Sequence, residues 1–121
     1  MSSENYLKET KLKQEREGAK HGDFFFAEYY NNSGQSKRAP VFIIGNDGDK
    51  KDVIICTCTS QASRGDWDKL VQLRKPTYIR TNKIYTIRRE QLLFRINYDL
   101  VNRLPNKYKE VMDSIRKALN L

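Results

Sequence analysis

Two apolar segments joined by a short turn limit most strongly what this chain can fold into. The first runs from Pro40 to Asn46 and the second from Asp52 to Ser60. The turn between them contains Asp47-Gly48, and residues of this kind accept the backbone angles of tight reversals, so the segments are predicted to be antiparallel strands. Neither segment alternates cleanly between apolar and polar residues. This is typical of a sheet covered on both faces or curled into a small barrel.

Shorter elements surround these two strands. The run from Asp23 to Tyr30 is predicted to be a strand, because three phenylalanines and two tyrosines suit a pleated surface better than a solvated helix. Apolar residues at helical spacing predict an amphipathic helix from Pro105 to Leu119 that packs on the sheet. The other predictions are a turn at Asn31–Gln35, a basic loop at Ser36–Pro40, short strands at Leu70–Leu73 and Tyr78–Lys83, a helical turn at Arg88–Leu92 and a strand at Leu93–Tyr98. The fold class is mainly β with helices (α+β).

The chain has 121 residues, a length that suits about one domain. Residues 1–20 carry five basic and four acidic groups but few apolar ones. They are predicted to form a charged arm that is either helical or disordered, since pairs such as Glu4 with Lys8 add only about 0.2–0.5 kcal/mol each to a helix. Residues 21–121 are predicted to form a single domain.

Basic residues outnumber acidic ones by 23 to 15, which gives a net charge of +8. The excess is concentrated between Lys69 and Arg95, where eight residues are basic and Glu90 alone is acidic. Such a bias attracts phosphate backbones or an acidic protein through long-range electrostatics. It is equally typical of a solvated basic surface, so charge alone leaves both interpretations open.

Other features argue against several classes of function. No apolar run reaches the roughly 18–20 residues of a membrane span, and the first residues lack a secretory signal, so a cytoplasmic protein is expected. No nucleotide-binding glycine motif is present, and no cofactor is expected. Cys56 and Cys58 lack a zinc-site spacing and are predicted to be buried free thiols. His21, the only histidine, is expected in an exposed loop, which disfavours a catalytic Ser-His-Asp or Cys-His site.

Arginine and hydroxyl groups remain as candidates for chemistry. RNA supplies its own nucleophile, the 2′-OH, so a protein that cleaves it must hold sugar and phosphate in line and offset the charge that develops on phosphorus. A guanidinium fork and hydroxyl donors suit this task. Arg38, before the first central strand, and Thr59, at the end of the second, are the candidate pair. Residues of these types are also common in purely structural roles at such positions.

Four short motifs follow one another in a recognisable order. They are Gly22-Asp23, the segment from Pro40 to Asp47, Cys58-Thr59-Ser60-Gln61, and Lys83-Ile84-Tyr85-Thr86-Ile87. Each is short, but in this order they resemble the MazF/PemK family of toxin endoribonucleases from about Gly22 to the C-terminus. The resemblance implies a small SH3-like antiparallel barrel of the MazF/PemK/CcdB superfamily with a C-terminal helix.

The resemblance also implies a function. Members of this family are toxins of toxin–antitoxin pairs, homodimers that cut single-stranded RNA at specific sequences without metal and leave 2′,3′-cyclic phosphate and 5′-OH ends. An acidic antitoxin protein blocks them. The resemblance implies that Thr59 is the catalytic threonine of this chain. The family places its catalytic arginine directly before proline, where this chain has Ala39, so Arg38 is predicted to take that role, with Lys37 as the alternative.

Further residues are predicted to contact RNA. The candidates for substrate binding are Lys37, Ser60, Gln61, Arg80 and Lys83, and those for base stacking are Tyr29, Tyr30, Trp67 and Tyr78. The displaced arginine supports a second hypothesis, a non-catalytic member of the superfamily that binds gyrase, as CcdB-type toxins do, or binds RNA. A third is a basic adaptor whose N-terminal arm binds a protein partner.

Overall fold

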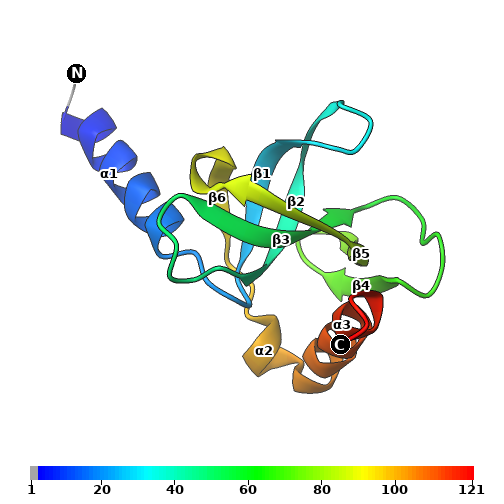
Figure 1. Ribbon diagram of the computed structural model, residues 1–121. Coiled ribbons are helices and arrows are strands. Elements are labelled where there is room, and N and C mark those ends of the chain that lie inside the picture. The colour runs from blue at the N-terminus through cyan, green and yellow to red at the C-terminus, as the bar shows by residue number, and fades with distance from the viewer. Residues whose placement is uncertain (1–2) are drawn as a thin grey trace.

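The computed structural model describes residues 3–121, which form one antiparallel sheet with helices around it (Figure 1). The helical elements are α1 (Ser3–Glu17), the 3₁₀ turn η1 (Arg89–Gln91), α2 (Leu100–Arg103) and α3 (Pro105–Ala118). The strands are β1 (Phe24–Tyr30), β2 (Ser36–Gly45), β3 (Asp52–Thr59), β4 (Asp68–Gln72), β5 (Pro76–Arg88) and β6 (Leu92–Ile96).

The strands lie in the order β4-β5-β3-β2-β1-β6, and every neighbouring pair is antiparallel. Within residues 3–121 the outer strands β4 and β6 do not pair with each other, so the sheet is open rather than closed into a barrel. The predicted α+β class, with an antiparallel sheet and a C-terminal helix, is confirmed. The word barrel applies to it only loosely.

Alternate side chains of the strands form a core on each face of the sheet. One face packs Phe25, Val41 and Ile55, and the other packs Phe24 and Phe42. All five side chains are fully buried. Because successive strand residues point to opposite faces, sequence neighbours serve different cores. The same alternation decides which polar side chains meet at the ends of the strands.

Helix α3 covers the second of these faces, as the sequence predicts. It begins at Pro105, whose missing N–H costs nothing in a first turn, and it buries Val111 and Ile115. Its contacts with the sheet are made chiefly to β5. The hydroxyls of Ser114 in α3 and Thr81 in β5 are hydrogen bonded in this interface.

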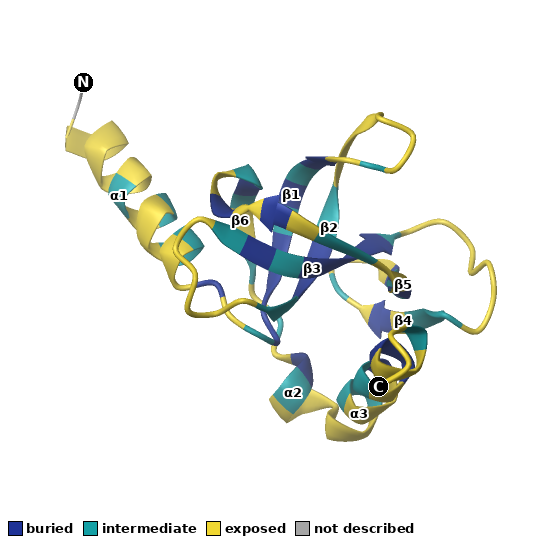
Figure 2. Cartoon of the chain, in the orientation of Figure 1, coloured by how far each residue is buried: buried dark blue, intermediate teal, exposed yellow. Residues whose placement is uncertain are grey.

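Most of the N-terminal arm forms helix α1, which is one of the two predicted alternatives. Residues 1 and 2 of the arm lie outside the described residues. None of the residues of α1 is buried, and the helix projects from the sheet (Figure 2). Only its C-terminal end is fastened, where Arg16 Nε donates a 2.6 Å hydrogen bond to the Leu92 carbonyl and Ala19 is buried nearby. The helix therefore adds little to the core.

The segment Ser36–Pro40, expected to be a basic loop, is the first half of β2. The reversal is completed earlier, because Asn31 Oδ1 accepts hydrogen bonds from the backbone N–H groups of Ser33 and Gln35, and Gly34 takes a positive φ of 76°. From Ser36 onward β2 pairs with β1 without a bulge. Side-chain directions along this segment are therefore fixed by the strand.

Candidate functional site

A groove of about 1610 Å³ runs past the ends of the central strands. It is lined by residues of β1, β2 and β3, the turns that follow β1, β3 and β4, part of β5, and the segment from β6 to α2. Eight of its lining side chains are basic, and none is acidic: Lys37, Arg38, Arg64, Arg74, Lys75, Arg80, Arg95 and Arg103. A concave surface with one sign of charge concentrates ligands of the opposite sign, here anions.

Most of the predicted site residues line this groove. It brings together Arg38, Thr59, Lys37, Ser60, Gln61 and Arg80. Lys83 lies outside it, exposed on β5, and Trp67 also lies elsewhere. Six of the seven residues predicted for catalysis or substrate binding therefore line one groove, and their roles stay predictions.

Thr59 ends β3 and shapes the turn that follows. Its Oγ1 accepts a 3.1 Å hydrogen bond from the backbone N–H of Gln61. Ser60 and Gln61 are exposed at the groove. Because the Thr59 oxygen serves as the acceptor, its own O–H proton remains available to a ligand.

Arg38 lies on the face of the sheet opposite to Thr59. It pairs across β1 with Glu28, and its Nη2 lies 3.4 Å from Glu28 Oε2. In the antiparallel β2–β3 ladder Val41 lies opposite Thr57. Continuing this register by two residues along each strand places Ala39, and not Arg38, opposite Thr59. No bulge in the β1–β2 ladder reverses this direction. The residue that faces Thr59 across the strands is thus a small apolar one.

Lys37 shares the Thr59 face because it is two residues from Ala39 on the same strand. It lies opposite Tyr29 of β1, and its side chain is exposed. The alternative basic residue of the sequence prediction therefore has the right direction, at the rim of the groove.

Arg80 approaches the Thr59 face from β5. Tyr78 lies opposite Thr59 in the β3–β5 ladder, and Arg80 follows two residues later on the same face. The Arg80 side chain is 17% exposed. Its Nε and Nη2 are buried and have no hydrogen-bond partner in residues 3–121. An ion pair joins Nε to Asp68 Oδ1 at 4.0 Å, which exceeds hydrogen-bond distance.

Buried Tyr29 lies on the same face, opposite Lys37, and the charge of Arg80 acts on it. Burial raises the pKa of Tyr29, and Cys58 and Tyr85 add to that rise. The positive charge of Arg80 and a hydrogen bond with Thr57 act in the opposite direction. Tyr29 is buried and does not line the groove, so it is not placed to stack on bases.

The two thiols are buried and free, as predicted. Cys58 lines the groove, but burial and the neighbouring Cys56 raise its pKa well above its ordinary value of 9.0. Burial raises the pKa of Cys56 to about 12. A neutral thiol is a poor nucleophile, so neither cysteine is suited to covalent catalysis.

His21 is not in the groove and is not the exposed loop residue that was expected. Its ring is half-buried, with Nδ1 2.8 Å from the Ile44 carbonyl oxygen and Nε2 hydrogen bonded to the Tyr108 hydroxyl. The ring also packs edge-on against Phe42. Both nitrogens are engaged in joining β2 to α3, so this histidine has a structural role.

An aromatic pair at the groove was missed in the sequence. Phe94 of β6 is 53% exposed and stacks on Phe26 of β1, with ring centroids 5.1 Å apart and an angle of 15° between the planes. Arg103 lies over the Tyr98 ring at 5.0 Å. The available signal was the alternation of strand side chains, which sets Phe94 of β6 on the same face as Phe26, its partner in β1.

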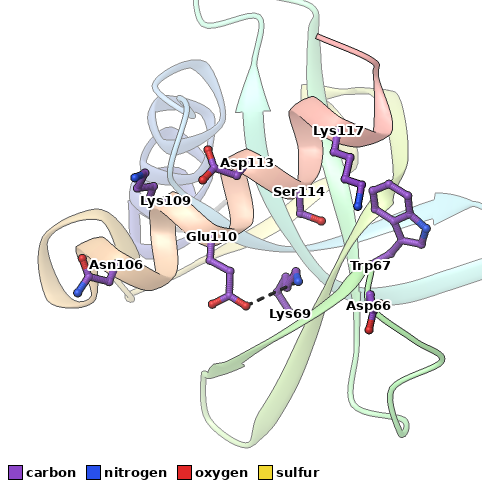
Figure 3. Close-up of a pocket in the computed structure, with 9 residues that line it drawn as sticks. All are labelled: Asp66, Trp67, Lys69, Asn106, Lys109, Glu110, Asp113, Ser114 and Lys117. Carbon is purple, nitrogen blue, oxygen red and sulfur yellow. Dashed lines mark ion pairs between the residues drawn. The ribbon is translucent and has the colours of Figure 1, made fainter.

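A smaller hollow of about 450 Å³ lies between the β4 region and α3 (Figure 3). Its acidic and basic side chains are mixed, as in the ion pair of 3.6 Å between Lys69 and Glu110. Lys117 lies over the ring of Trp67 at 6.0 Å. Because its charges offset one another, this hollow has no bias toward anions.

No group of three or more histidine, cysteine or acidic residues is placed to hold a metal ion in residues 3–121. Over the same residues, no helix is long and apolar enough to cross a membrane.

No family model and no curated protein matches the sequence. Solved structures do match. MazF from Deinococcus radiodurans has a TM-score of 0.70 at 14% identity, over 85% of this chain and 97% of that one. An endoribonuclease in complex with its cognate antitoxin, from a Mycobacterial species, has a TM-score of 0.66 at 15% identity, over 85% of this chain and 96% of that one. The Mycobacterium tuberculosis toxin MazF-mt6 has a TM-score of 0.62 at 18% identity, over 82% of this chain and 97% of that one. The chain therefore has the fold of MazF toxins.

Proposed function

We propose that this chain, with its MazF fold, is the toxin of a toxin–antitoxin pair and a sequence-specific endoribonuclease that cleaves single-stranded RNA. The observation that carries the proposal is the groove, where eight basic side chains and no acidic one surround the Thr59-Ser60-Gln61 turn. Such a surface suits a polyanion whose unpaired bases are accessible. The similar solved structures support the same activity, since they are named as MazF toxins and endoribonucleases.

The proposed reaction uses the RNA as its own nucleophile and needs no metal or cofactor. The 2′-oxygen attacks the adjacent phosphorus and releases its proton to solvent, and the bond from phosphorus to the 5′-oxygen breaks. The leaving oxygen takes a proton from water. The products are a 2′,3′-cyclic phosphate and a 5′-OH end. The protein has to align these atoms and to stabilise the extra negative charge on the phosphoryl oxygens.

Thr59 is proposed to bind the scissile phosphate. Its oxygen already accepts the Gln61 N–H, so its O–H can donate to a phosphoryl oxygen. Ser60 and Gln61, both exposed, add a hydroxyl and an amide that can contact phosphate or a base edge. One short turn thus supplies three hydrogen-bond donor side chains, two with hydroxyl groups and one with an amide.

The groove arginines act as permanent cations, because a guanidinium is not deprotonated in proteins. They stabilise charge and do not transfer protons. That Arg38 is the catalytic arginine stays a prediction, and its position beside Glu28 suits contact with the RNA backbone at the groove edge. Lys37 is proposed to contact the backbone from the Thr59 face, and the role of Lys83 stays a prediction.

Base stacking is proposed for the exposed aromatic pair. Phe94 and Phe26 present a stacked apolar surface inside a basic groove, the combination on which unpaired bases stack in many nucleic-acid-binding proteins. Tyr30 is also exposed nearby on β1, outside the groove lining. The stacking surface would hold nucleotides that flank the cut.

The proposed partners follow from the same charge. An acidic antitoxin segment would compete with RNA for the basic groove, and one similar structure is an endoribonuclease with its cognate antitoxin. A homodimer and a cytoplasmic location complete the proposal.

A non-catalytic RNA-binding protein is the second candidate. The observation in its favour is the separation of Arg38 and Thr59 onto opposite faces, which deprives Thr59 of the arginine that the family pattern provides. Under this alternative, RNA binds the groove and is not cut.

The test is cleavage of a long single-stranded RNA in EDTA, with chemical analysis of the product ends. Wild type is expected to cut at one short motif and to leave cyclic phosphate ends. Thr59→Val should lose about 100–1000-fold in rate, the effect of removing one donor to a transition-state oxyanion. Thr86→Val is the matched control, because Thr86 is exposed on β5 outside the groove. Binding of RNA by wild type without cleavage would favour the second candidate.

A further inference from the structure

We propose that Arg80 supplies the guanidinium that stabilises the transition state opposite Thr59, in place of an arginine on β2. The inference rests on the proposed function and names the residue that performs its electrostatic step. It makes Arg80 a catalytic residue that contacts the scissile phosphate, rather than a general contact to RNA.

The direction of its side chain favours Arg80 over Arg38. The Thr59 face of the sheet carries Ala39 on β2 and Arg80 on β5, whereas Arg38 belongs to the other face. The β4–β5 ladder is regular from Gln72 to Asp68, so the alternation that sets the direction of Arg80 is not disturbed by a bulge there. Arg80 also lines the same groove as Thr59.

Hydrogen bonding also favours Arg80. Buried polar atoms are almost always partnered in folded proteins, and a buried charged donor without a partner costs free energy. The Nε and Nη2 atoms of Arg80 are both buried and have no hydrogen-bond partner within residues 3–121. A phosphate provides two oxygens in the geometry that a guanidinium fork binds through two hydrogen bonds. The groove is therefore short of an acceptor of the kind that RNA brings.

The Arg80 guanidinium is also freer to move than that of Arg38. Because Nε and Nη2 are covered in the free protein, RNA binding must shift the fork or a neighbouring side chain before they contact phosphate. Turning the guanidinium breaks no hydrogen bond of Nε or Nη2, since neither nitrogen makes one, and it gives up only the 4.0 Å ion pair with Asp68. Arg38 is already engaged with Glu28, at 3.4 Å.

Asp68 is placed to position Arg80 without neutralising it fully. Its Oδ2 accepts a 2.9 Å hydrogen bond from the Arg64 N–H, which fixes the turn after Thr59, and its Oδ1 is 4.0 Å from Arg80 Nε. The carboxylate is thereby held by the backbone and keeps the guanidinium on the groove side. At 4.0 Å it leaves the guanidinium hydrogen atoms available for a phosphate.

Lys37 is the competing cation on the same face. It is exposed at the rim, and an ammonium acts as a single hydrated charge without the planar fork. This difference predicts that a lysine at position 80 cannot replace the arginine fully.

The experiment measures kcat and KM on a long single-stranded RNA for wild type, Arg80→Ala, Arg80→Lys, Arg38→Ala and Arg88→Ala. We expect Arg80→Ala to lose about 100–1000-fold in kcat with a small change in KM, and Arg80→Lys to recover only part of the loss. Arg88→Ala is the matched control, because Arg88 is exposed on β5 outside the groove, and Arg38→Ala tests the competing assignment on β2. Adding guanidinium ion at millimolar concentration should raise the rate of Arg80→Ala and leave that of Arg38→Ala unchanged. A purely structural role for Arg80 would give no such rescue.

The outcomes separate the inference from the proposed function. Cleavage by wild type together with near-normal kcat in Arg80→Ala overturns the inference and leaves the endoribonuclease intact, and a large loss in Arg38→Ala would then return the role to β2. Absence of cleavage by wild type overturns both. If Arg80→Ala does not fold, Arg80→Lys decides, because it keeps the buried stem and charge; full activity in that variant contradicts the need for the fork.

Discussion

Arg89, which is buried beside β5, and Arg80, which is half-buried on β5, differ in how their guanidinium groups are hydrogen bonded. Arg89 in η1 is 2% exposed, and its guanidinium donates hydrogen bonds to backbone carbonyls on two sides. The acceptors are the carbonyl oxygens of Arg16, Glu17, Ala19, Asn46, Asp47 and Asp49, at 2.7–3.5 Å. Arg80, nine residues earlier, has two buried nitrogens with no such partner.

The difference shows how one chemical group serves stability in one place and a ligand in another. Arg89 joins the end of α1 to the turn between β2 and β3, so its hydrogen-bond donors are occupied by carbonyl groups of the protein itself. Arg80 lines the basic groove and keeps its donors unused. Strained or unsatisfied groups tend to collect at functional sites, where a ligand compensates them.

Replacing Arg89 should produce the largest loss of stability. Arg89→Met leaves several carbonyls without their donor, and we expect the unfolding free energy to fall by about 3–5 kcal/mol, the scale for breaking a buried charged network. Urea denaturation followed through the single tryptophan, Trp67, measures it. A loss below about 1 kcal/mol would show that these hydrogen bonds do not hold the arm and turn together.

Replacing Arg80 should lower stability less than replacing Arg89. Arg80→Met removes a cation whose Nε and Nη2 make no hydrogen bond, but it leaves the Asp68 carboxylate, 6% exposed, without its ion pair and with only the hydrogen bond from the Arg64 N–H, so the unfolding free energy is expected to fall by about 1–3 kcal/mol. The same denaturation experiment measures this change beside that of Arg89→Met. Equal losses in the two variants would abolish the contrast between the arginines.

The exposed cations of the groove should each have a smaller effect, on RNA affinity. Arg64→Ala is expected to reduce the slope of log affinity against log salt concentration by about 0.7, the contribution of one phosphate contact to a single strand. Fluorescence anisotropy with a labelled 2′-O-methyl RNA measures it. Arg88→Ala is the control, because Arg88 pairs with Glu90 at 3.1 Å and does not line the groove. Equal slopes in all three proteins would contradict the groove as the RNA site.

Arg38 should show the smallest effect on stability. Its side chain is 66% exposed, and an exposed ion pair such as the one with Glu28 contributes about 0–1 kcal/mol. Arg38→Ala is therefore expected to shift the urea midpoint only slightly, with Glu28→Ala giving a similar small shift. A loss of several kcal/mol would mean that the β1–β2 hairpin depends on this pair.

Much of the fold was predictable from local patterns. The aromatic strand at β1, the turn at Asn31–Gln35 and the helix from Pro105 follow from side-chain chemistry over a few residues, and the structure contains them. The open sheet was not predictable, because closure depends on whether β4 meets β6, two segments far apart in the sequence. Strand patterns alone do not determine that contact.

The candidate site was predictable as a group of residues but not in the directions of their side chains. Thr59 and its basic neighbours were predicted because their residue types and order resemble a family pattern, and they line one groove. Whether Arg38 or Arg80 shares the Thr59 face depends on register, and a shift of one residue reverses the direction of a side chain. Arg89 was counted among the basic residues of Lys69–Arg95, yet it is buried, since sequence charge does not reveal which carbonyls surround a guanidinium.

The proposed mechanism requires RNA to bind the unused hydrogen-bond donors of Arg80 beside Thr59. The most direct test is the NMR spectrum of the arginine Nε–H groups during titration with a random-sequence 2′-O-methyl RNA, which cannot undergo 2′-OH attack. We predict that the Arg80 signal shifts and becomes protected from solvent exchange, while that of Arg89, already bonded to the Asp49 carbonyl at 2.7 Å, does not move. An unchanged Arg80 signal in RNA-saturated protein would contradict the account.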